Sequence, residues 1–176
     1  MLNENFSYEY DSFSRHYIVR NARLFFVNFS GSEQDYNQAG RRNFRLEINE
    51  DLAREMQALG VYVREREATD EYNEKQYLLK VSVYPDADIR LLSGNSMTKA
   101  VIDNNNPDLD MGRMLDDEFR KGHVLNGNVD LEFHVSKNTK VPSSSPYLRV
   151  DMLVMPIRRS KLAEAYADYE DDDLPM

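Results

Sequence analysis

Short segments in which apolar and polar residues alternate recur along most of the chain, and this pattern constrains its fold more than any other feature. The clearest is 129–135, where four apolar residues alternate with three polar ones. A period of two is typical of a half-buried strand, because successive side chains point to opposite faces. Further strands are expected at 16–29, 41–48, 61–66, 76–84, 89–92 and 147–157.

One segment between these strands predicts an early helix. Asn49 can cap it, and Glu50 and Asp51 suit the positive end of the helix dipole. Apolar residues then recur at helical spacing up to Gly60, which is placed to end the helix. The pattern therefore predicts a mainly β protein, an OB-fold-like small β-barrel with one early helix and insertions in its long middle. Another small barrel or a sandwich would give the same pattern.

The charges are distributed unevenly, and their distribution matters more than the net charge of −9. Residues 161–176 hold six acids and one base, whereas residues 15–45 hold six arginines and two acids. A basic region in the same chain as an acidic end fits a protein with one surface for nucleic acid and a separate end for protein partners. An acidic protein with one arginine-rich pair of strands would show the same distribution.

Several functional classes lack the residues that they need. The absence of cysteine excludes disulfides, cysteine metal sites and thiol nucleophiles. No phosphate-binding glycine loop, zinc signature or nucleophile elbow occurs, and the histidines at 16, 123 and 134 have no metal-ligand spacing. We therefore expect no enzyme, no cofactor and no metal. Without an apolar run near the ~20 residues of a membrane span, and without a signal peptide, a cytoplasmic location is expected.

Basic and aromatic side chains repeat across neighbouring predicted strands, on the faces that the alternation leaves exposed. Binding a single strand without sequence preference needs cations along the phosphates and aromatic faces for the bases, each stacked base contributing roughly 1–3 kcal/mol. The candidate DNA-binding residues are Arg23, Phe25, Phe29, Arg41, Arg45, Tyr62, Arg64, Arg66, Lys80 and Tyr84. Phe25 and Phe29 are also strong candidates for the core, because a one-residue slip in register exchanges the two faces of a strand.

The segment 169–176 is a short acidic run followed by an aliphatic residue, a proline and a final apolar residue. It resembles the acidic tip of bacterial single-stranded DNA-binding proteins, although Met176 stands where that tip has phenylalanine. The resemblance implies a flexible hook that docks replication and repair enzymes onto coated DNA. Its partner-binding residues would be Asp171, Asp172, Asp173, Leu174, Pro175 and Met176. The alternative is a solvated acidic end that keeps the chain soluble.

Two motifs near the start of the chain are Asn21-Ala22-Arg23-Leu24-Phe25-Phe26 with Asn28-Phe29-Ser30-Gly31, and Gly40-x-Arg42-Asn43-Phe44. With the helix start at 51–53, the Gly-Val-Tyr-Val segment at 60–63 and the strands at 128–131 and 147–155, they make residues 20–160 resemble a known family. It is the family of phage-encoded single-stranded DNA-binding proteins with an OB-fold. The resemblance implies a role in DNA replication or recombination in an infected bacterial cell, with exonucleases, recombinases, primases or helicases as partners.

Together these observations divide the chain into a flexible N-terminal arm (1–14), an OB-fold-like single-stranded DNA-binding domain (15–158) and an acidic protein-interaction tail (159–176). The leading hypothesis is a non-enzymatic binder that holds single-stranded DNA without sequence preference, protects it and recruits partners through its tip. The alternative is an acidic interaction protein or DNA mimic that inhibits a host nucleic-acid enzyme. The net charge favours this alternative, and the arginines of 15–45 disfavour it.

Overall fold

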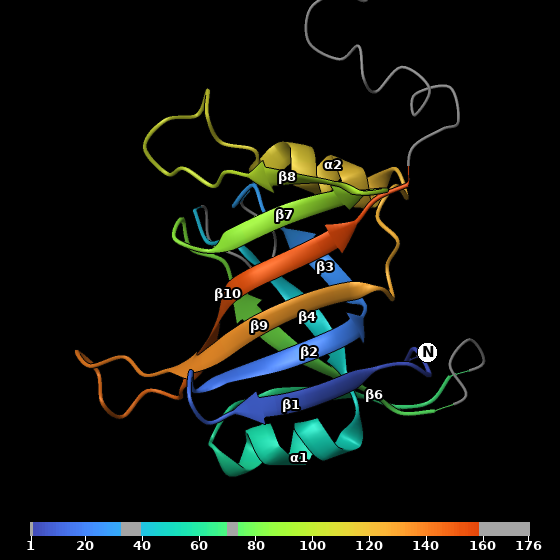
Figure 1. Ribbon diagram of the computed structural model, residues 1–176. Helices are drawn as coiled ribbons and strands as arrows, with labels where there is room; N and C mark the ends of the chain where they lie inside the picture. The colour runs from blue at the N-terminus through green and yellow to red at the C-terminus, as the bar shows by residue number, and fades with distance from the viewer. Residues whose placement is uncertain (1, 33–39, 70–73, 159–176) are drawn as a thin grey trace, which may run out of the picture.

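A computed structural model describes residues 2–32, 40–69 and 74–158, which form a mainly β structure of ten strands and two short helices (Figure 1). The strands are β1 (Ser7–Asp11), β2 (His16–Ala22), β3 (Leu24–Asn28), β4 (Asn43–Ile48), β5 (Val63–Arg66), β6 (Gln76–Ser82), β7 (Asp88–Ser93), β8 (Ser96–Ala100), β9 (Val129–Ser136) and β10 (Tyr147–Pro156). The helices are α1 (Glu50–Ala58) and α2 (Gly112–Arg120). The prediction of a mainly β protein with an early helix is confirmed.

All the strands belong to one sheet, whose main path runs β1-β2-β9-β10-β6-β4-β3. Off this path, β5 pairs with β6, and β7 pairs with β10 and β8. Most neighbours are antiparallel, but β10 runs parallel to both β6 and β7. The path ends at β1 and β3 within the described residues, so the sheet is not closed by strand pairing into the small β-barrel that was expected.

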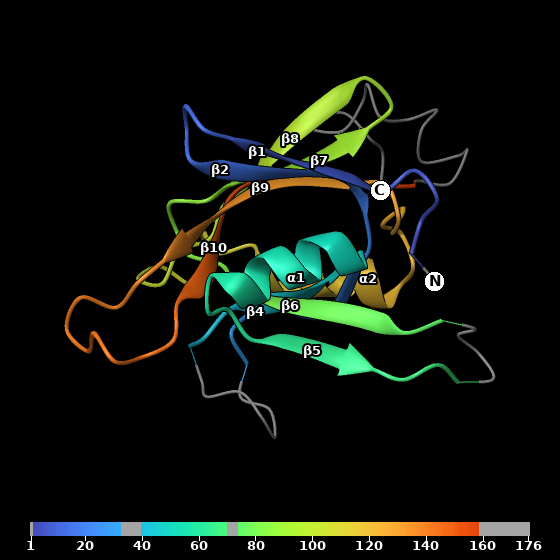
Figure 2. The ribbon, with the colours of Figure 1, turned by 90° about the horizontal axis from the view of Figure 1, so that it is seen from below.

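The sheet is nevertheless strongly curved. Only Arg23 separates β2 from β3, so one bent segment pairs with β9 through its first half and with β4 through its second. Seen from below, β1, β2 and β9 lie on one side of the molecule and β4, β5 and β6 on the other (Figure 2). At this bend the chain itself joins the two sides of the sheet, rather than hydrogen bonds between β2 and β3.

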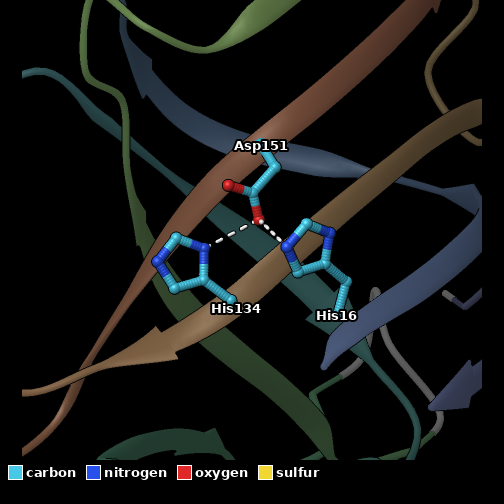
Figure 3. Close-up of side chains that lie close together, drawn as sticks. All are labelled: His16, His134 and Asp151. Carbon is cyan, nitrogen blue, oxygen red and sulfur yellow. Dashed lines mark hydrogen bonds and ion pairs between the residues drawn. The ribbon is translucent and has the colours of Figure 1, made fainter. Parts of the chain in front are cut away.

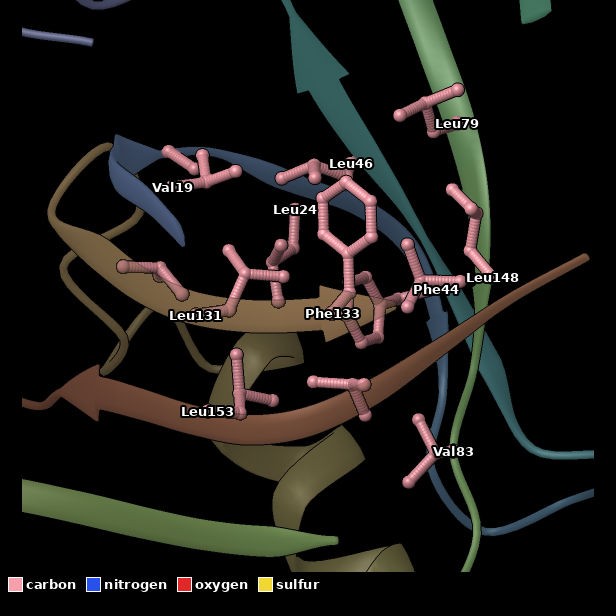
Figure 4. Close-up of a cluster of buried hydrophobic side chains, with 14 of the residues drawn as sticks. Val19, Leu24, Phe44, Leu46, Leu79, Val83, Leu131, Phe133, Leu148 and Leu153 are labelled. Carbon is pink, nitrogen blue, oxygen red and sulfur yellow. The ribbon is translucent and has the colours of Figure 1, made fainter. Parts of the chain in front are cut away.

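Hydrophobic side chains from both sides fill the space inside this curved sheet (Figure 4). Leu131 and Phe133 come from β9, Phe44 and Leu46 come from β4, and all four are almost completely buried. In Figure 1, α1 lies at one end of the sheet and α2 at the other. Neither helix that the structure describes is long and apolar enough to cross a membrane.

The first helix forms where the sequence predicts it. The Asn49 side chain accepts a hydrogen bond from the Leu52 N–H at 2.9 Å, which satisfies a backbone donor that the first turn leaves unpaired. Leu52 and Met56 are fully buried beneath the sheet. Gly60 follows the helix with a φ of +87°, a left-handed conformation that glycine adopts without strain.

The second helix, α2, is fixed to the end of β3. Its Leu115 is fully buried, and the Phe119 ring lies 6.0 Å from the Phe29 ring, centroid to centroid. The Asp116 carboxylate accepts hydrogen bonds from the backbone N–H groups of Phe29 and Ser30, at 2.7 and 3.1 Å. The helix therefore holds the chain in place where it leaves β3.

Two strands differ from the expectation. Residues 1–14 were expected to form a flexible arm, but β1 lies within them and pairs with β2, and Phe6 and Tyr8 pack against the core. The strand β8 was not expected, because only Ala100 of its five residues is buried and the segment lacks alternation. Both strands lie outside the central part of the sheet. They are defined by their pairing with a neighbouring strand rather than by burial of their side chains.

Candidate nucleic-acid interface

A groove with a volume of about 560 Å³ lies where β4 and β6 meet the residues before β5 and the start of β10. Its functional groups are four cations and three tyrosines: Arg41, Arg42, Arg45, Lys80, Tyr62, Tyr84 and Tyr147. None of the described residues that line it is acidic. In a chain with a net charge of −9, this gathers positive charge at one place, where it can attract an anionic ligand.

Arg45 lies at the centre of a row of side chains that crosses three strands. It stands opposite Phe25 of β3 on one side and opposite Lys80 of β6 on the other. Partial burial, followed by the charge of Arg64, lowers the pKa of Arg45. Partial burial also lowers the pKa of Lys80, and the charges of Arg45 and Arg41 lower it further. These cations repel one another, and a phosphate placed between them would relieve that repulsion.

The tyrosines supply aromatic faces beside these cations. Tyr62 is 77 % exposed. The Arg149 guanidinium lies over the Tyr84 ring, 4.0 Å from its centroid, and Asp86 accepts a hydrogen bond from that guanidinium at 3.0 Å. Burial, followed by the neighbouring Tyr147, raises the pKa of Tyr84, so its phenol is neutral at physiological pH. Neutral aromatic faces next to cations are the groups on which single-stranded bases stack.

Arg42 also lines the groove, but its side chain is only 9 % exposed and is held by the fold. It donates hydrogen bonds to the Phe29 carbonyl at 2.7 Å and to Asn104 at 3.2 Å, and it forms an ion pair with Asp110 at 2.9 Å. Gly112 permits this arrangement, because a side chain there would collide with the Phe29 carbonyl and the Arg42 guanidinium. The charge of Arg42 is therefore already compensated, and its role is to fix the wall of the groove.

Most of the residues predicted to bind DNA come together here. Five line the groove: Arg41, Arg45, Tyr62, Lys80 and Tyr84. Three lie beside those five: Arg23, Phe25 and Arg64. Phe25 stands opposite Arg45, and the Arg23 guanidinium lies 5.0 Å from the centroid of the Phe25 ring. Of these eight residues, Arg45, Arg64 and Lys80 lie on β4, β5 and β6, where alternation was the signal.

Phe29 was wrongly predicted to face DNA. It is 0 % exposed, and its ring lies 5.8 Å from that of Phe44 in the core. The cause is an irregularity in β3, whose pairing with β4 shifts between Phe25 and Asn28, while Phe26 adopts a φ of +50°. The alternation slips by one residue there, so Phe29 turns inward.

Arg66 is the other predicted residue that the structure does not bring to the groove. It lies at the far end of β5 and donates a hydrogen bond to the Gln76 side chain at 3.3 Å. Gln76 in turn donates to the buried carboxylate of Glu47 at 2.6 Å. Arg66 thus belongs to a polar network at the opposite end of the strand.

Sequence reasoning missed three exposed or half-exposed groups near the groove. Tyr147 and Arg149 alternate with the buried Leu148 and Val150 at the start of β10, and this alternation was the available signal. Phe26 is 60 % exposed, and its ring lies 6.4 Å from that of Phe25. Its position inside an apolar run favoured burial, and the sequence gives no sign of the irregularity that exposes it.

The six residues predicted to bind partners are Asp171, Asp172, Asp173, Leu174, Pro175 and Met176, and they lie outside the described residues.

The model of a protein family matches part of the chain. No curated protein is significantly similar to the chain. The model of a family described as "Putative phage ssDNA-binding domain" matches residues 11–99, just over half of the chain. The matched region contains α1, the strands from β2 to β7 and all ten residues predicted to bind DNA. The chain therefore belongs to the "Putative phage ssDNA-binding domain" family.

Proposed function

We propose that this protein binds single-stranded DNA along the groove, without sequence preference, and that it acts as a binder rather than an enzyme. One observation carries the proposal: Arg41, Arg45 and Lys80 line the groove together with three tyrosines, and none of its described lining residues is acidic. Cations can follow the phosphates while tyrosine faces accept bases of any sequence. Membership of the phage family supports the same ligand.

The arrangement of the strands supports this function. The bent segment β2–β3 pairs with β4, β4 with β6, β6 with β10, β10 with β9, and β9 with β2. We interpret this succession, which returns to the segment where it began, as the framework of an OB-fold, a partly open five-stranded barrel whose sheet face and adjoining loops bind oligonucleotides. The strands β1, β5, β7 and β8 are then additions to that framework.

The same proposal gives the acidic end a role. In the cytoplasm of an infected bacterial cell, the domain would coat and protect single-stranded DNA, and residues 171–176 would recruit an exonuclease, recombinase, primase or helicase. The support is the resemblance of that end to the acidic tip of bacterial single-stranded DNA-binding proteins. Its charge is also opposite to that of the groove.

Fluorescence anisotropy tests the ligand. A labelled oligo-dT of about 30 nucleotides exceeds the roughly 4–16 nucleotides that one OB-fold covers. We expect tight binding to this strand, weak binding to the matching duplex and an affinity that falls as salt rises. If neither DNA binds at low salt, the proposal is wrong.

Replacing Arg41 and Arg45 with alanine separates this proposal from a DNA mimic that inhibits a host enzyme. A DNA binder loses affinity for oligo-dT, because two of the groove's cations are gone. A mimic gains nothing from a basic face, so its inhibition of the host enzyme would be unchanged or improved. Circular dichroism of both proteins checks that the fold is intact.

A further inference from the structure

Two histidines and an aspartate meet on one face of β2, β9 and β10, although they lie far apart in the sequence (Figure 3). One donor atom from each of His16, His134 and Asp151 lies within 4.8 Å of the other two. Their side chains are 28–30 % exposed. Sequence spacing gave no sign of the cluster, because strand pairing creates it. Tyr17 of β2 stands opposite Phe133 of β9, which brings the preceding His16 beside His134.

The distances suit three ligands of one metal ion. His134 Nδ1 lies 2.7 Å from Asp151 Oδ2, and His16 Nε2 lies 3.4 Å from the same oxygen. In a tetrahedral zinc site with bonds of about 2.0–2.2 Å, neighbouring ligand atoms lie roughly 3.3 Å apart. To admit an ion, the His134 and Asp151 side chains must move apart by roughly 0.6 Å. The ligand nitrogens of the two histidines lie within 4.8 Å of each other. Partial exposure of the cluster leaves room for a water as the fourth ligand.

The carboxylate of Asp151 is aimed by a β-bulge. The pairing of β10 with β9 shifts between Val150, which faces Phe133, and Met152, which faces Glu132. Asp151 is the extra residue between them, and its carboxylate points toward both imidazole rings (Figure 3). Bulges of this kind re-aim side chains and are frequent beside functional sites.

A second carboxylate orients one of the histidines. Glu132 Oε2 lies 3.3 Å from His16 Nδ1, on the opposite side of the ring from the Nε2 that faces Asp151. Histidines that bind metals almost always give their second ring nitrogen to a carboxylate or carbonyl, which fixes the tautomer and the direction of the ring. Glu132 thus supplies the supporting contact that a metal-binding His16 requires.

We propose that His16, His134 and Asp151 bind a zinc ion, with Glu132 as the positioning residue for His16. Two histidines and one carboxylate are a donor set found in zinc sites that keep a fourth position for water. The bound ion ties β2, β9 and β10 together. It also offsets the negative charges of Asp151 and Glu132, which already face the two imidazole rings.

Calorimetric titration of the full chain with zinc chloride tests the site. The protein is used without an affinity tag, after treatment with a chelator and dialysis. We expect one zinc ion per chain, and a Tm that rises by roughly 5–10 °C when zinc exceeds its Kd a hundredfold. Glu132→Gln should weaken zinc binding by roughly 10–100-fold, and His16→Gln or His134→Gln should weaken it further.

The matched control is His123→Gln, because His123 also contacts one carboxylate, that of Glu118 at 3.1 Å, but lies outside the cluster. It should bind zinc as the parent protein does. If a ligand variant unfolds, the absorption spectrum of the cobalt-loaded parent protein still reports the site, through the bands of a tetrahedral nitrogen and oxygen environment. Two outcomes overturn the proposal: no zinc binding by the parent protein, or binding that both histidine variants retain at the same affinity.

Discussion

Arg45 and Lys80 stand directly opposite each other in the β4–β6 ladder, so two cations occupy adjacent positions of one row. Like charges placed opposite each other destabilise a sheet, and the lowered pKa of Lys80 reflects both its partial burial and the charge of Arg45. The fold gains nothing from this arrangement. The arrangement instead favours the binding of a polyanion in the groove, because both positive charges attract its phosphates.

Replacing Lys80 with glutamine should therefore have opposite effects on stability and on DNA binding. We expect the free energy of unfolding to rise by up to roughly 0.5 kcal/mol at low salt, because the pair with Arg45 no longer repels. Affinity for oligo-dT should fall, because a phosphate loses its partner. Urea unfolding and anisotropy measure the two effects. Loss of stability together with unchanged affinity would show that Lys80 serves the fold and not the ligand.

Phe26 and Phe29 form a matched pair, because both are phenylalanines near the end of β3 but only one is exposed. Phe26→Ala should leave stability within about 0.5 kcal/mol and weaken oligo-dT binding through loss of a stacking face worth roughly 1–3 kcal/mol. Phe29→Ala should destabilise the protein by roughly 3–5 kcal/mol, because it empties a core position. Thermal unfolding measures the stability of both variants, and anisotropy measures their binding to oligo-dT. If both folded variants lose the same affinity, the assignment of Phe26 to DNA and of Phe29 to the core is contradicted.

The contrast between these two residues shows what the sequence can predict. Alternation correctly left Arg45, Tyr62 and Lys80 accessible, because β4 and β6 pair along their length without a shift in register. It failed in β3, where the register shifts next to Phe26. Such an irregularity depends on how β3 pairs with β4 and how α2 holds the end of β3, and neither contact is visible in a local pattern.

The same limit applies to contacts between distant segments. The cap of α1 at Asn49 was predictable, because the Asn49 side chain bonds to a residue only three positions away. The contact between Asp116 and Phe29 joins residues 87 positions apart, so the anchoring of α2 could not be predicted from the sequence. His16, His134 and Asp151 likewise meet only through the order of the strands in the sheet. Sequence reasoning therefore recovered local features and missed those that long-range pairing creates.

Deleting residues 161–176 should tighten binding to oligo-dT. The segment carries six acids and one base, and it can compete with DNA for the cations of the groove. Because charges attract over about 10 Å at 0.1 M salt, the gain in affinity should be largest at low salt and should vanish as salt rises. Anisotropy with the shortened protein measures it. Unchanged or weaker binding at low salt would contradict the proposed competition.

Tyr17 should make the protein sensitive to alkaline pH. Burial, followed by the charge of Glu55 and its hydrogen bond, raises the pKa of Tyr17 from 10.0 to about 12. The neutral phenol is thus favoured in the folded state, so its contribution to stability is complete below pH 10.0 and is lost as pH rises toward about 12. Urea unfolding between these pH values should show a decline that Tyr17→Phe reduces by roughly 2 kcal/mol. An equal decline in both proteins would contradict this.

The salt dependence of oligo-dT binding tests the role of the groove most directly. The parent protein is compared with an Arg45→Gln, Lys80→Gln double variant and with Lys99→Gln, which removes an exposed cation from β8, outside the groove. For single strands, each phosphate contact adds about 0.7 to the slope of log affinity against log salt, so the double variant should lose about 1.4. Lys99→Gln should keep the parent slope. If the double variant keeps both the slope and the affinity of the parent, single-stranded DNA does not bind in this groove.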